Sequence, residues 1–248
     1  MKTKIRLHFL FSIALAGCAL ASSAKAAVSV SLSATAPTED VYKFQEIPSG
    51  GTASNVTAYK RVSSTILERT VGQGFSTESE TGDLLMTAVT FKIYNFSDAV
   101  EGLDFTISLY EGTSITAASP ASATLLSRQT GTLPETLVTG NYITFDLGTP
   151  VTLSPDKYYS VVYSFAELTS SGSTANSIGF ATIGSGNSNT TGGRRWLGDD
   201  GTYTGSTSNG LVLYVHAVAV PEPATWALLF GIFAAALAIV RKRLSIVS

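Results

Sequence analysis

Short apolar runs alternate with turn residues along the chain from residue 27 to residue 219. Phe105, Ile107 and Leu109 are separated by single polar residues, and Phe91 and Ile93 show the same spacing. Side chains two positions apart point to the same face of a β-strand, so this spacing predicts strands with one buried face. The strands predicted in this way include residues 28–33, 84–94, 103–110, 142–147, 158–165, 178–183 and 211–220.

Residues that favour turns separate these runs. Thr149-Pro150 and Ser154-Pro155-Asp156 have this composition, and we expect a break in the chain at each of them. The sequence from 27 to 219 has no sustained 3.6-residue apolar period with helix caps. We therefore predict an all-β fold, a single jelly-roll-like β-sandwich over residues 27–219, with its longest loops at 169–177 and 184–193.

A different apolar pattern stands before this domain. Lys2, Lys4 and Arg6 precede an apolar stretch, which leads to Ala24-Lys25-Ala26. A positive segment, an apolar core and an A-x-A site are typical of a secretory signal peptide, so residues 1–26 are predicted to form a signal helix that is cleaved after Ala26. Leu15-Ala16-Gly17-Cys18 leaves a second interpretation open, in which Cys18 is lipidated and becomes the new N-terminus.

A second apolar run follows the domain. Residues 224–240 are 17 consecutive uncharged, mostly apolar residues, followed by three basic ones. A helix of this length reaches about 25 Å, near the lower limit for crossing a bilayer core of about 30 Å. The positive-inside rule places the basic residues in the cytoplasm when the preceding domain has been exported. We predict a transmembrane helix over 224–240 and a basic stop formed by Arg241, Lys242 and Arg243.

The cysteine content and net charge of the domain differ from those of the whole chain once the predicted signal peptide and C-terminal segment are set apart. The only cysteine is Cys18, so the chain beyond it forms no disulfide and depends on its apolar core. Residues 27–219 hold nine basic and 17 acidic residues, a net charge of −8. This charge argues against nucleic acid and anionic membrane surfaces as partners.

The residues that carry most enzyme chemistry are scarce. His216 is the only histidine after residue 8, it has no nearby serine motif, and we expect it on the outer or edge face of the last strand. One histidine without cysteine makes a zinc site improbable, and we predict no metal, no cofactor and no catalytic residue. A glycosidase would need two facing carboxylates, and spacing selects no pair among the acids available, which are Glu68, Glu78, Glu80, Asp83, Asp104 and Glu111.

One glycine-rich stretch, residues 192–203, combines aromatic and charged side chains. In one interpretation it is a ligand site, a carbohydrate-binding loop in which an aromatic ring stacks on a sugar and polar groups fix its orientation. In the other it is a β-hairpin in which Trp196 covers the core and the charged residues decorate the turn. The candidate ligand residues are Arg195, Trp196, Asp199, Asp200 and Tyr203.

The segment 220–243 resembles the PEP-CTERM sorting signal of Gram-negative bacteria, also called the ice-binding protein C-terminal domain. Pro221, Glu222 and Pro223 match its motif, and the apolar span and basic stop follow in the family's order. The resemblance implies that an exosortase recognises the motif in the membrane, removes the helix and passes the protein to the cell surface.

The domain itself is similar to the choice-of-anchor domains of type R. The stretches that match are residues 73–76, 105–110, 158–163 and 196–203. This similarity implies an extracellular role. The expected function is thus that of an exported, non-enzymatic, structural or adhesive protein of the cell surface or matrix, with exosortase, the secretion machinery, the membrane and exopolysaccharide as partners. The alternative is a carbohydrate-binding module that uses the Trp196 loop, and a glycosidase comes after it.

Overall fold

The computed structural model describes residues 27–49, 51–172, 174–184 and 191–220. The predicted signal peptide, with Cys18, and the sorting segment from Pro221 to Arg243 lie outside the described residues. Over the described ranges the regular elements are β-strands and one short 3-10 turn, η1 (Asp98–Val100), which confirms the all-β prediction. No helix of the described part is long and apolar enough to cross a membrane.

The strands are numbered in chain order. They are β1 (Ser29–Ser33), β2 (Val41–Gln45), β3 (Ser54–Val62), β4 (Ile66–Ser76), β5 (Leu84–Phe96), β6 (Asp104–Gly112), β7 (Thr124–Thr132), β8 (Tyr142–Leu153), β9 (Tyr158–Phe165), β10 (Ser170–Ser171), β11 (Ile178–Thr182), β12 (Arg195–Asp199), β13 (Thr202–Ser206) and β14 (Leu213–Ala219).

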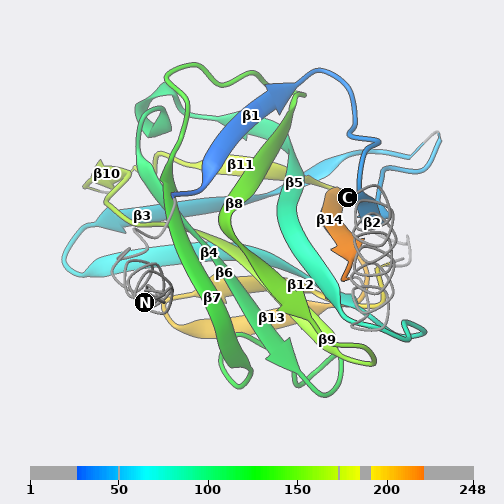
Figure 1. Cartoon of the computed structure of the whole chain (residues 1–248). Helices are drawn as coiled ribbons and strands as arrows, with labels where there is room; N and C mark the ends of the chain where they lie inside the picture. Colours follow the sequence, from blue (N-terminus) through cyan, green and yellow to red (C-terminus); the bar gives the residue numbers. More distant parts are fainter. Residues whose placement is uncertain (1–26, 50, 173, 185–190, 221–248) are drawn as a thin grey trace, which may run out of the picture.

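Nine of these strands follow one another as hydrogen-bonded neighbours in the order β1-β8-β5-β11-β3-β4-β9-β6-β7. The two ends of this series meet, because Val28 forms a bridge with Gly131 and its N–H donates to the Thr130 carbonyl at 2.9 Å. The sheet is therefore closed, and it forms two facing layers that resemble a flattened barrel (Figure 1). Strand β11 joins the layers on one side by pairing with both β5 and β3.

Two branches widen the layers. Strand β14 pairs with β5 over residues 84–91 and carries β2 on its other side. The β12–β13 hairpin pairs with β4. Val71 of β4 pairs with Tyr163 of β9 and also with Leu197 of β12. Because a residue has one neighbouring strand on each side, the hairpin lies on the side of β4 away from β9.

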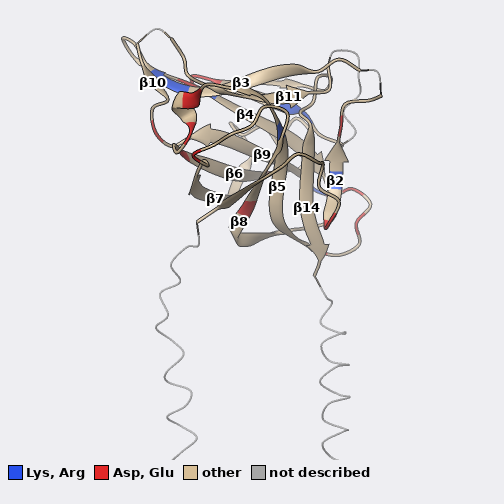
Figure 2. Cartoon of the chain, turned by 90° about the horizontal axis from the view of Figure 1, so that it is seen from above, with Lys and Arg blue, Asp and Glu red and all other residues tan. Residues whose placement is uncertain are grey.

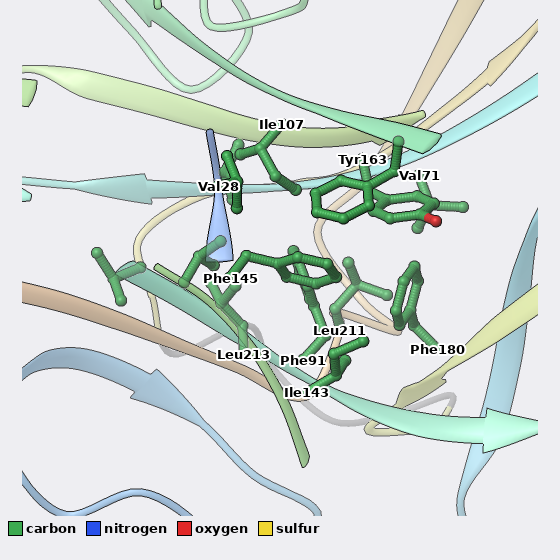
Figure 3. Close-up of a cluster of buried hydrophobic side chains, with 14 of the residues drawn as sticks. Val28, Val71, Phe91, Ile107, Ile143, Phe145, Tyr163, Phe180, Leu211 and Leu213 are labelled. Atoms are coloured by element: carbon green, nitrogen blue, oxygen red, sulfur yellow. The ribbon is translucent and has the colours of Figure 1, made fainter. Parts of the chain in front are cut away.

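An aromatic core fills the space between the layers. Phe105 of β6 and Tyr163 of β9 project from one layer and contact Phe145 of β8 in the other, with ring centroids 4.9 and 5.7 Å apart. Phe180 of β11 lies 5.2 Å from Tyr163 and 5.0 Å from Phe91 of β5, so the joining strand belongs to the same cluster (Figure 3). The predicted inward residues of the alternating runs are therefore the ones that form the core.

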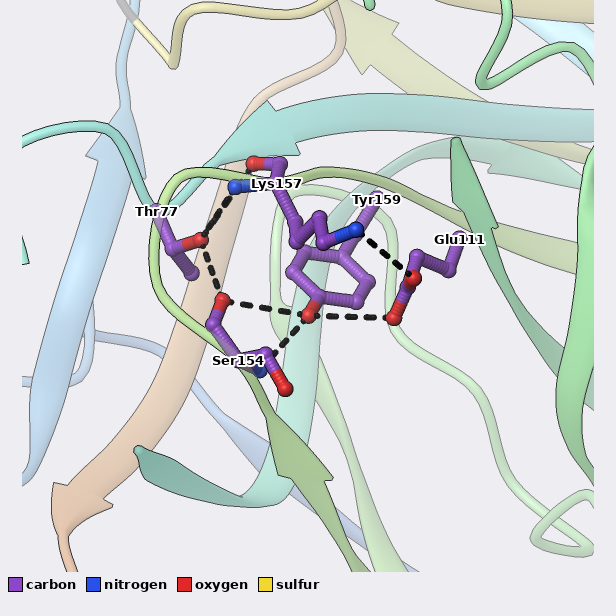
Figure 4. Close-up of polar contacts among 5 residues, drawn as sticks. All are labelled: Thr77, Glu111, Ser154, Lys157 and Tyr159. Carbon is purple, nitrogen blue, oxygen red and sulfur yellow. Dashed lines mark hydrogen bonds and ion pairs between the residues drawn. The ribbon is translucent and has the colours of Figure 1, made fainter. Parts of the chain in front are cut away.

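A polar network fixes one end of the closed sheet (Figure 4). The turn after β8 presents the Ser154 carbonyl to the Thr77 hydroxyl at 2.7 Å, and the Ser154 N–H donates to the Tyr159 hydroxyl oxygen at 2.7 Å. Lys157 forms an ion pair with Glu111 at 3.5 Å. Burial raises the pKa of Tyr159 to about 12, and the charge of nearby Glu111 acts in the same direction. The predicted turn at residues 154–156 is confirmed, with Asp156 at a φ of 53°.

The first and last strands of the domain reach the same end of it. Strand β14 runs antiparallel to β5 and finishes with Ala219 opposite Leu84, where β5 begins. Strand β1 runs parallel to β5 because each is antiparallel to β8, so β1 also starts toward that end. Residues 27 and 220 consequently leave the body on one side, and charged residues are distributed over the periphery (Figure 2).

Two sequence expectations differ from the structure. The predicted break at Thr149-Pro150 lies inside β8, which continues to Leu153. Residues 147–150 have no partner on β5 because the register shifts there, and an irregularity of this kind accommodates a proline within a strand. The predicted loop at 169–177 contains the short strand β10, which pairs with β3. Of the other predicted loop, 184–193, residues 185–190 lie outside the described ranges.

Candidate functional site

The glycine-rich stretch that the sequence singles out folds as the β12–β13 hairpin. Asp200 and Gly201 connect the strands with φ values of 50° and 85°, and Asp199 pairs with Thr202 on either side of them. Two-residue loops with positive φ at both positions are the hairpin turns that match the twist of the strands, and Asp-Gly is a favoured sequence for them. The stretch is therefore a β-hairpin, as the second interpretation expects, although Trp196 belongs to neither of the two buried hydrophobic clusters.

Trp196 is almost completely enclosed. It is 5% exposed, and it lies directly opposite Gly205 of β13. A Cβ atom at Gly205 would stand 2.7 Å from the Trp196 ring, so the ring rests on the glycine backbone. The indole N–H is buried and has no hydrogen-bond partner within the described ranges. With so little exposed surface, the ring offers no free face on which a sugar could stack.

The two aspartates of the predicted site hold the hairpin against β4. Asp199 binds the Arg69 guanidinium through two bonds, of 2.7 Å from Nε and 3.1 Å from Nη2. The hydrogen bond to Asp199 raises the pKa of Arg69, against the opposing effect of burial. Asp200 accepts the Glu68 backbone N–H at 2.9 Å. Both carboxylates are thus occupied in positioning the turn.

Arg195 projects from the face of β12 opposite to that of Trp196. Neighbouring side chains along a strand alternate in direction, so Arg195 and Trp196 point to different sides of the hairpin. Burial lowers the pKa of Arg195, and the guanidinium forms no ion pair with any residue that the structure describes. The five candidate ligand residues therefore do not converge on one point.

Tyr203 differs from the other four, because it lines a groove. It pairs with Gly198, and a Cβ atom at Gly198 would stand 2.7 Å from the Tyr203 ring and 2.4 Å from the Thr70 hydroxyl. The half-buried ring thus lies across the glycine at the edge of a cavity of about 450 Å³. The polar residues that line this cavity are Lys60, Glu68, Thr70, Thr106, Ser108, Tyr110, Arg128, Ser164 and Tyr203. We call it the outer-face groove.

The groove gathers charged and phenolic groups around the Tyr203 hydroxyl. Thr70 donates to the Tyr203 oxygen at 3.5 Å. Burial raises the pKa of Tyr203, the Thr70 hydrogen bond lowers it, and the charges of Glu68 and Arg128 act on it in opposite directions. Arg128 donates to the Ser108 hydroxyl at 3.4 Å, and Lys60 donates to the Ala166 carbonyl at 3.3 Å.

Sequence reasoning missed most of these residues, although a signal for them exists. In β6 the residues Phe105, Ile107 and Leu109 face the core, so the intervening Thr106, Ser108 and Tyr110 face outward. The inward set of this alternation forms part of the core, and the outward set forms part of the groove. What the sequence does not contain is the long-range pairing that places Gly198 opposite Thr70 and Thr106 opposite Ser164.

His216 faces outward from β14, but this strand is not an edge, because it lies between β2 and β5. His216 is 8% exposed, its Nδ1 lies 3.1 Å from the Glu39 carbonyl, and its Nε2 lies 2.9 Å from the Thr90 hydroxyl. The Thr90 hydroxyl also bonds that of Thr144 at 2.7 Å. These contacts join the loop before β2 to the sheet. No group of His, Cys, Asp and Glu side chains suited to a metal ion occurs in the described part of the chain.

Three of the six carboxylates considered for a glycosidase have separate partners. Glu111 pairs with Lys157, Asp104 accepts the Thr132 hydroxyl at 2.6 Å, and Glu78 accepts the Tyr158 hydroxyl. Glu68 lines the outer-face groove. The predicted sorting residues, Pro221 to Pro223 and Arg241 to Arg243, lie outside the described residues, as does Cys18.

Comparison with known proteins gives little further information. No family model matches the chain, and no curated protein matches it. A crystal structure of the cysteine protease and lectin-like domains of Cwp84, a surface layer associated protein of Clostridium difficile, aligns with a TM-score of 0.42 and 10% sequence identity. The alignment covers 75% of this chain and 37% of that one. Similarity at this level carries no argument about function.

Proposed function

We propose that this protein is an exported, non-enzymatic component of the bacterial cell surface or extracellular matrix, in which a structural or adhesive β-sandwich is delivered by a PEP-CTERM signal. The proposal includes a cleaved signal helix over residues 1–26 and a temporary transmembrane helix over residues 224–240. Its main support is the order of motif, apolar span and basic stop in residues 220–243.

The described domain suits a location outside the cytoplasm. It contains no cysteine, so its folding does not depend on the redox state of its compartment. A continuous apolar cluster from both layers stabilises it instead. A net charge of −8 over residues 27–219 favours solubility and disfavours adsorption to anionic lipid.

The direction of the strands also supports delivery from a membrane. Residue 220, which precedes the Pro221-Glu222-Pro223 motif, lies at the end of the domain where β14 finishes, and its N–H donates to the Asp83 carbonyl at 3.0 Å. If the residues after 220 attach the domain to a membrane, the end of the domain opposite residue 220 would point away from the lipid. The motif would then lie between the folded body and the bilayer, where a membrane enzyme can reach it.

The buried Trp196 does not favour the alternative of a carbohydrate-binding module centred on that ring, because the ring has 5% of its surface exposed. The glycosidase alternative has no observation in its favour among the carboxylate contacts described above.

Fractionation of cells that contain an exosortase tests the proposal. The unmodified protein should be found at the cell surface or in the medium, and Glu222→Ala should accumulate in the inner-membrane fraction, because the enzyme no longer recognises the motif. Asp83→Asn is the matched control, since it removes an exposed acid close to residue 220 and should be distributed like the unmodified protein. If Glu222→Ala were distributed like the unmodified protein, the sorting proposal would be wrong.

A further inference from the structure

We propose that the outer-face groove binds a neutral polysaccharide chain through a tyrosine stacking surface, a floor of hydroxyl groups and three charged side chains that can hydrogen-bond sugar hydroxyls. This inference is independent of the sorting proposal, because it concerns only the described domain. The site also differs from the Trp196 loop, of whose candidate residues only Tyr203 takes part.

The stacking surface is Tyr203. Its ring lies against the Gly198 backbone on one side, which fixes its orientation, and it is half-buried at the groove. A rigid aromatic ring supported in this way loses little conformational entropy when a ligand packs on it. Tyr110 of β6 contributes a second half-buried phenol to the same groove.

The floor is polar and made of short side chains. Thr70 of β4 and Ser164 of β9 are partly exposed on the outer side of the layer, and Thr106 and Ser108 of β6 also line the groove but are only 8% and 4% exposed. Each hydroxyl both donates and accepts a hydrogen bond, which matches the hydroxyl groups of a sugar. These short side chains lie on strands between Arg128 of β7 and Tyr203 of β13, so the groove is hollow between two longer side chains.

The charged groups of the groove are available to a ligand. Lys60, Glu68 and Arg128 form no ion pairs among the residues described, and the two cations each make one hydrogen bond to the protein, which leaves further N–H groups free. A carboxylate accepts, and an ammonium or guanidinium donates, hydrogen bonds that are stronger than those between neutral groups. Together they can fix the orientation of adjacent sugar hydroxyls.

The charge pattern favours a neutral chain over an acidic one. Lys60 and Arg128 give the lining two positive charges, but Glu68 would repel a uronate placed beside it, and the net charge of −8 over residues 27–219 would slow the approach of any polyanion. The lining side chains come from seven strands, β3, β4, β6, β7, β9, β12 and β13. Since adjacent strands lie about 4.8 Å apart, a site that extends across the layer suits a chain of sugars better than a single one.

Affinity electrophoresis of the full-length protein tests the proposal, with soluble β-glucan, galactomannan or polygalacturonate cast in the gel. We expect slower migration in at least one of the two neutral polymers and none in polygalacturonate. Tyr203→Ala should weaken the binding at least ten-fold, and Glu68→Gln, which keeps the shape of the side chain, should weaken it several-fold.

Tyr94→Ala is the matched control, since Tyr94 of β5 is a tyrosine with 40% exposure that does not line the groove. This variant should bind like the unmodified protein, and equal thermal midpoints would show that Tyr203→Ala remains folded. Failure to bind either neutral polymer, binding to polygalacturonate alone, or unchanged binding by Tyr203→Ala would overturn the proposal. None of these results depends on whether residues 220–243 are cleaved.

Discussion

Two aromatic residues of the β12–β13 hairpin each lie on the glycine opposite. Trp196 pairs with Gly205 and Tyr203 pairs with Gly198, so each ring covers backbone that would otherwise be exposed. Aromatic side chains compensate for glycine in a strand in this way. The two rings differ in exposure, because Trp196 is enclosed and Tyr203 is only half-buried at the outer-face groove. One therefore serves stability, and the other is available for recognition.

Trp196→Ala should lower the free energy of unfolding by about 3 kcal/mol, because truncating an enclosed tryptophan leaves a cavity and uncovers Gly205. In a domain of this size the thermal midpoint should fall by about 6–12 °C. Urea unfolding followed by circular dichroism measures the change. Tyr94→Ala, at an exposed position, should stay within about 0.5 kcal/mol of the unmodified protein. An equally stable Trp196→Ala protein would show that the ring does not support the hairpin.

Glu46 is a carboxylate that accepts three hydrogen bonds from its surroundings. Its Oε2 accepts the Tyr142 hydroxyl at 2.8 Å and the Tyr214 hydroxyl at 2.6 Å, and Lys92 lies beside Tyr142. Burial alone would raise the pKa of Glu46, but the hydrogen bonds from Tyr214, the Ile47 N–H and Tyr142 outweigh it, so the pKa lies below 4.5. The folded state therefore favours the ionised form.

This lowered pKa predicts a pH dependence of stability with a definite sign. The contribution of Glu46 is fully present above the ordinary pKa of a glutamate, and it is lost as the pH falls through the lower pKa of the folded state. Glu46→Gln should therefore be less stable than the unmodified protein at neutral pH, and the difference should shrink in acid. Urea midpoints of both proteins over a pH series measure it. A difference that stays constant below pH 4.5 would contradict the assignment.

At the scale of elements, the closure of the sheet depends on the contact between the start of β1 and β7. Val28 bridges Gly131, and a Cβ atom at Gly131 would stand 2.5 Å from the Val28 carbonyl oxygen and 2.7 Å from the Phe105 ring. Only glycine allows the two chains to approach so closely. The contact joins the ends of the nine-strand series and excludes water from the core at that side.

Gly131→Ala should destabilise the protein by about 2 kcal/mol, because the added methyl group meets backbone that cannot move without opening this contact. Hydrogen exchange should show faster exchange of the Val28 N–H, which donates to Thr130. Gly82→Ala provides the comparison, since a Cβ atom there meets nothing within 4 Å, and it should be neutral or slightly stabilising. Equal stability of the two variants would exclude a structural role for the close approach.

The strands that could be predicted from the sequence are those with strong apolar alternation. Strands β5, β6, β9, β11 and β14 contain buried residues at most inward positions, and each lies within or overlaps a predicted run. Strand β7 is not among the predicted strands, because its only buried residues are Gln129 and Gly131, and neither has an apolar side chain. The β12–β13 hairpin was foreseen as an alternative, from the Asp200-Gly201 turn.

At the scale of the whole molecule, the sequence could name candidate chemistry but not its assembly. The aromatic and charged composition of residues 192–203 indicates a candidate site at the hairpin, and Tyr203 does line a groove there. Asp199 and Asp200 were unsuitable as ligand groups because Arg69 and the Glu68 backbone bind them, and these partners lie about 130 residues earlier in the chain. Contacts of such separation are set by strand order, which local patterns do not encode.

The positions of the two ends of the domain are compatible with the proposed delivery from a membrane. The sheet of the domain is closed on itself, and the outer-face groove lies on one of its layers. The chain enters and leaves the domain on one side, at residues 27 and 220. Under the proposed function, the C-terminal segment serves delivery and not folding. The central claim is therefore that the segment after residue 220 is removed from the mature protein.

Intact mass spectrometry of the protein recovered from cells with and without an exosortase tests this claim most directly. The full chain has a mass of 25.9 kDa. With the enzyme present, the account predicts a protein that begins at Ala27 and has lost the apolar span and the basic stop Arg241 to Arg243. Without the enzyme, it predicts the same N-terminus and a retained C-terminal segment. An uncut C-terminus in both strains would contradict the account and leave residues 224–240 as a permanent anchor.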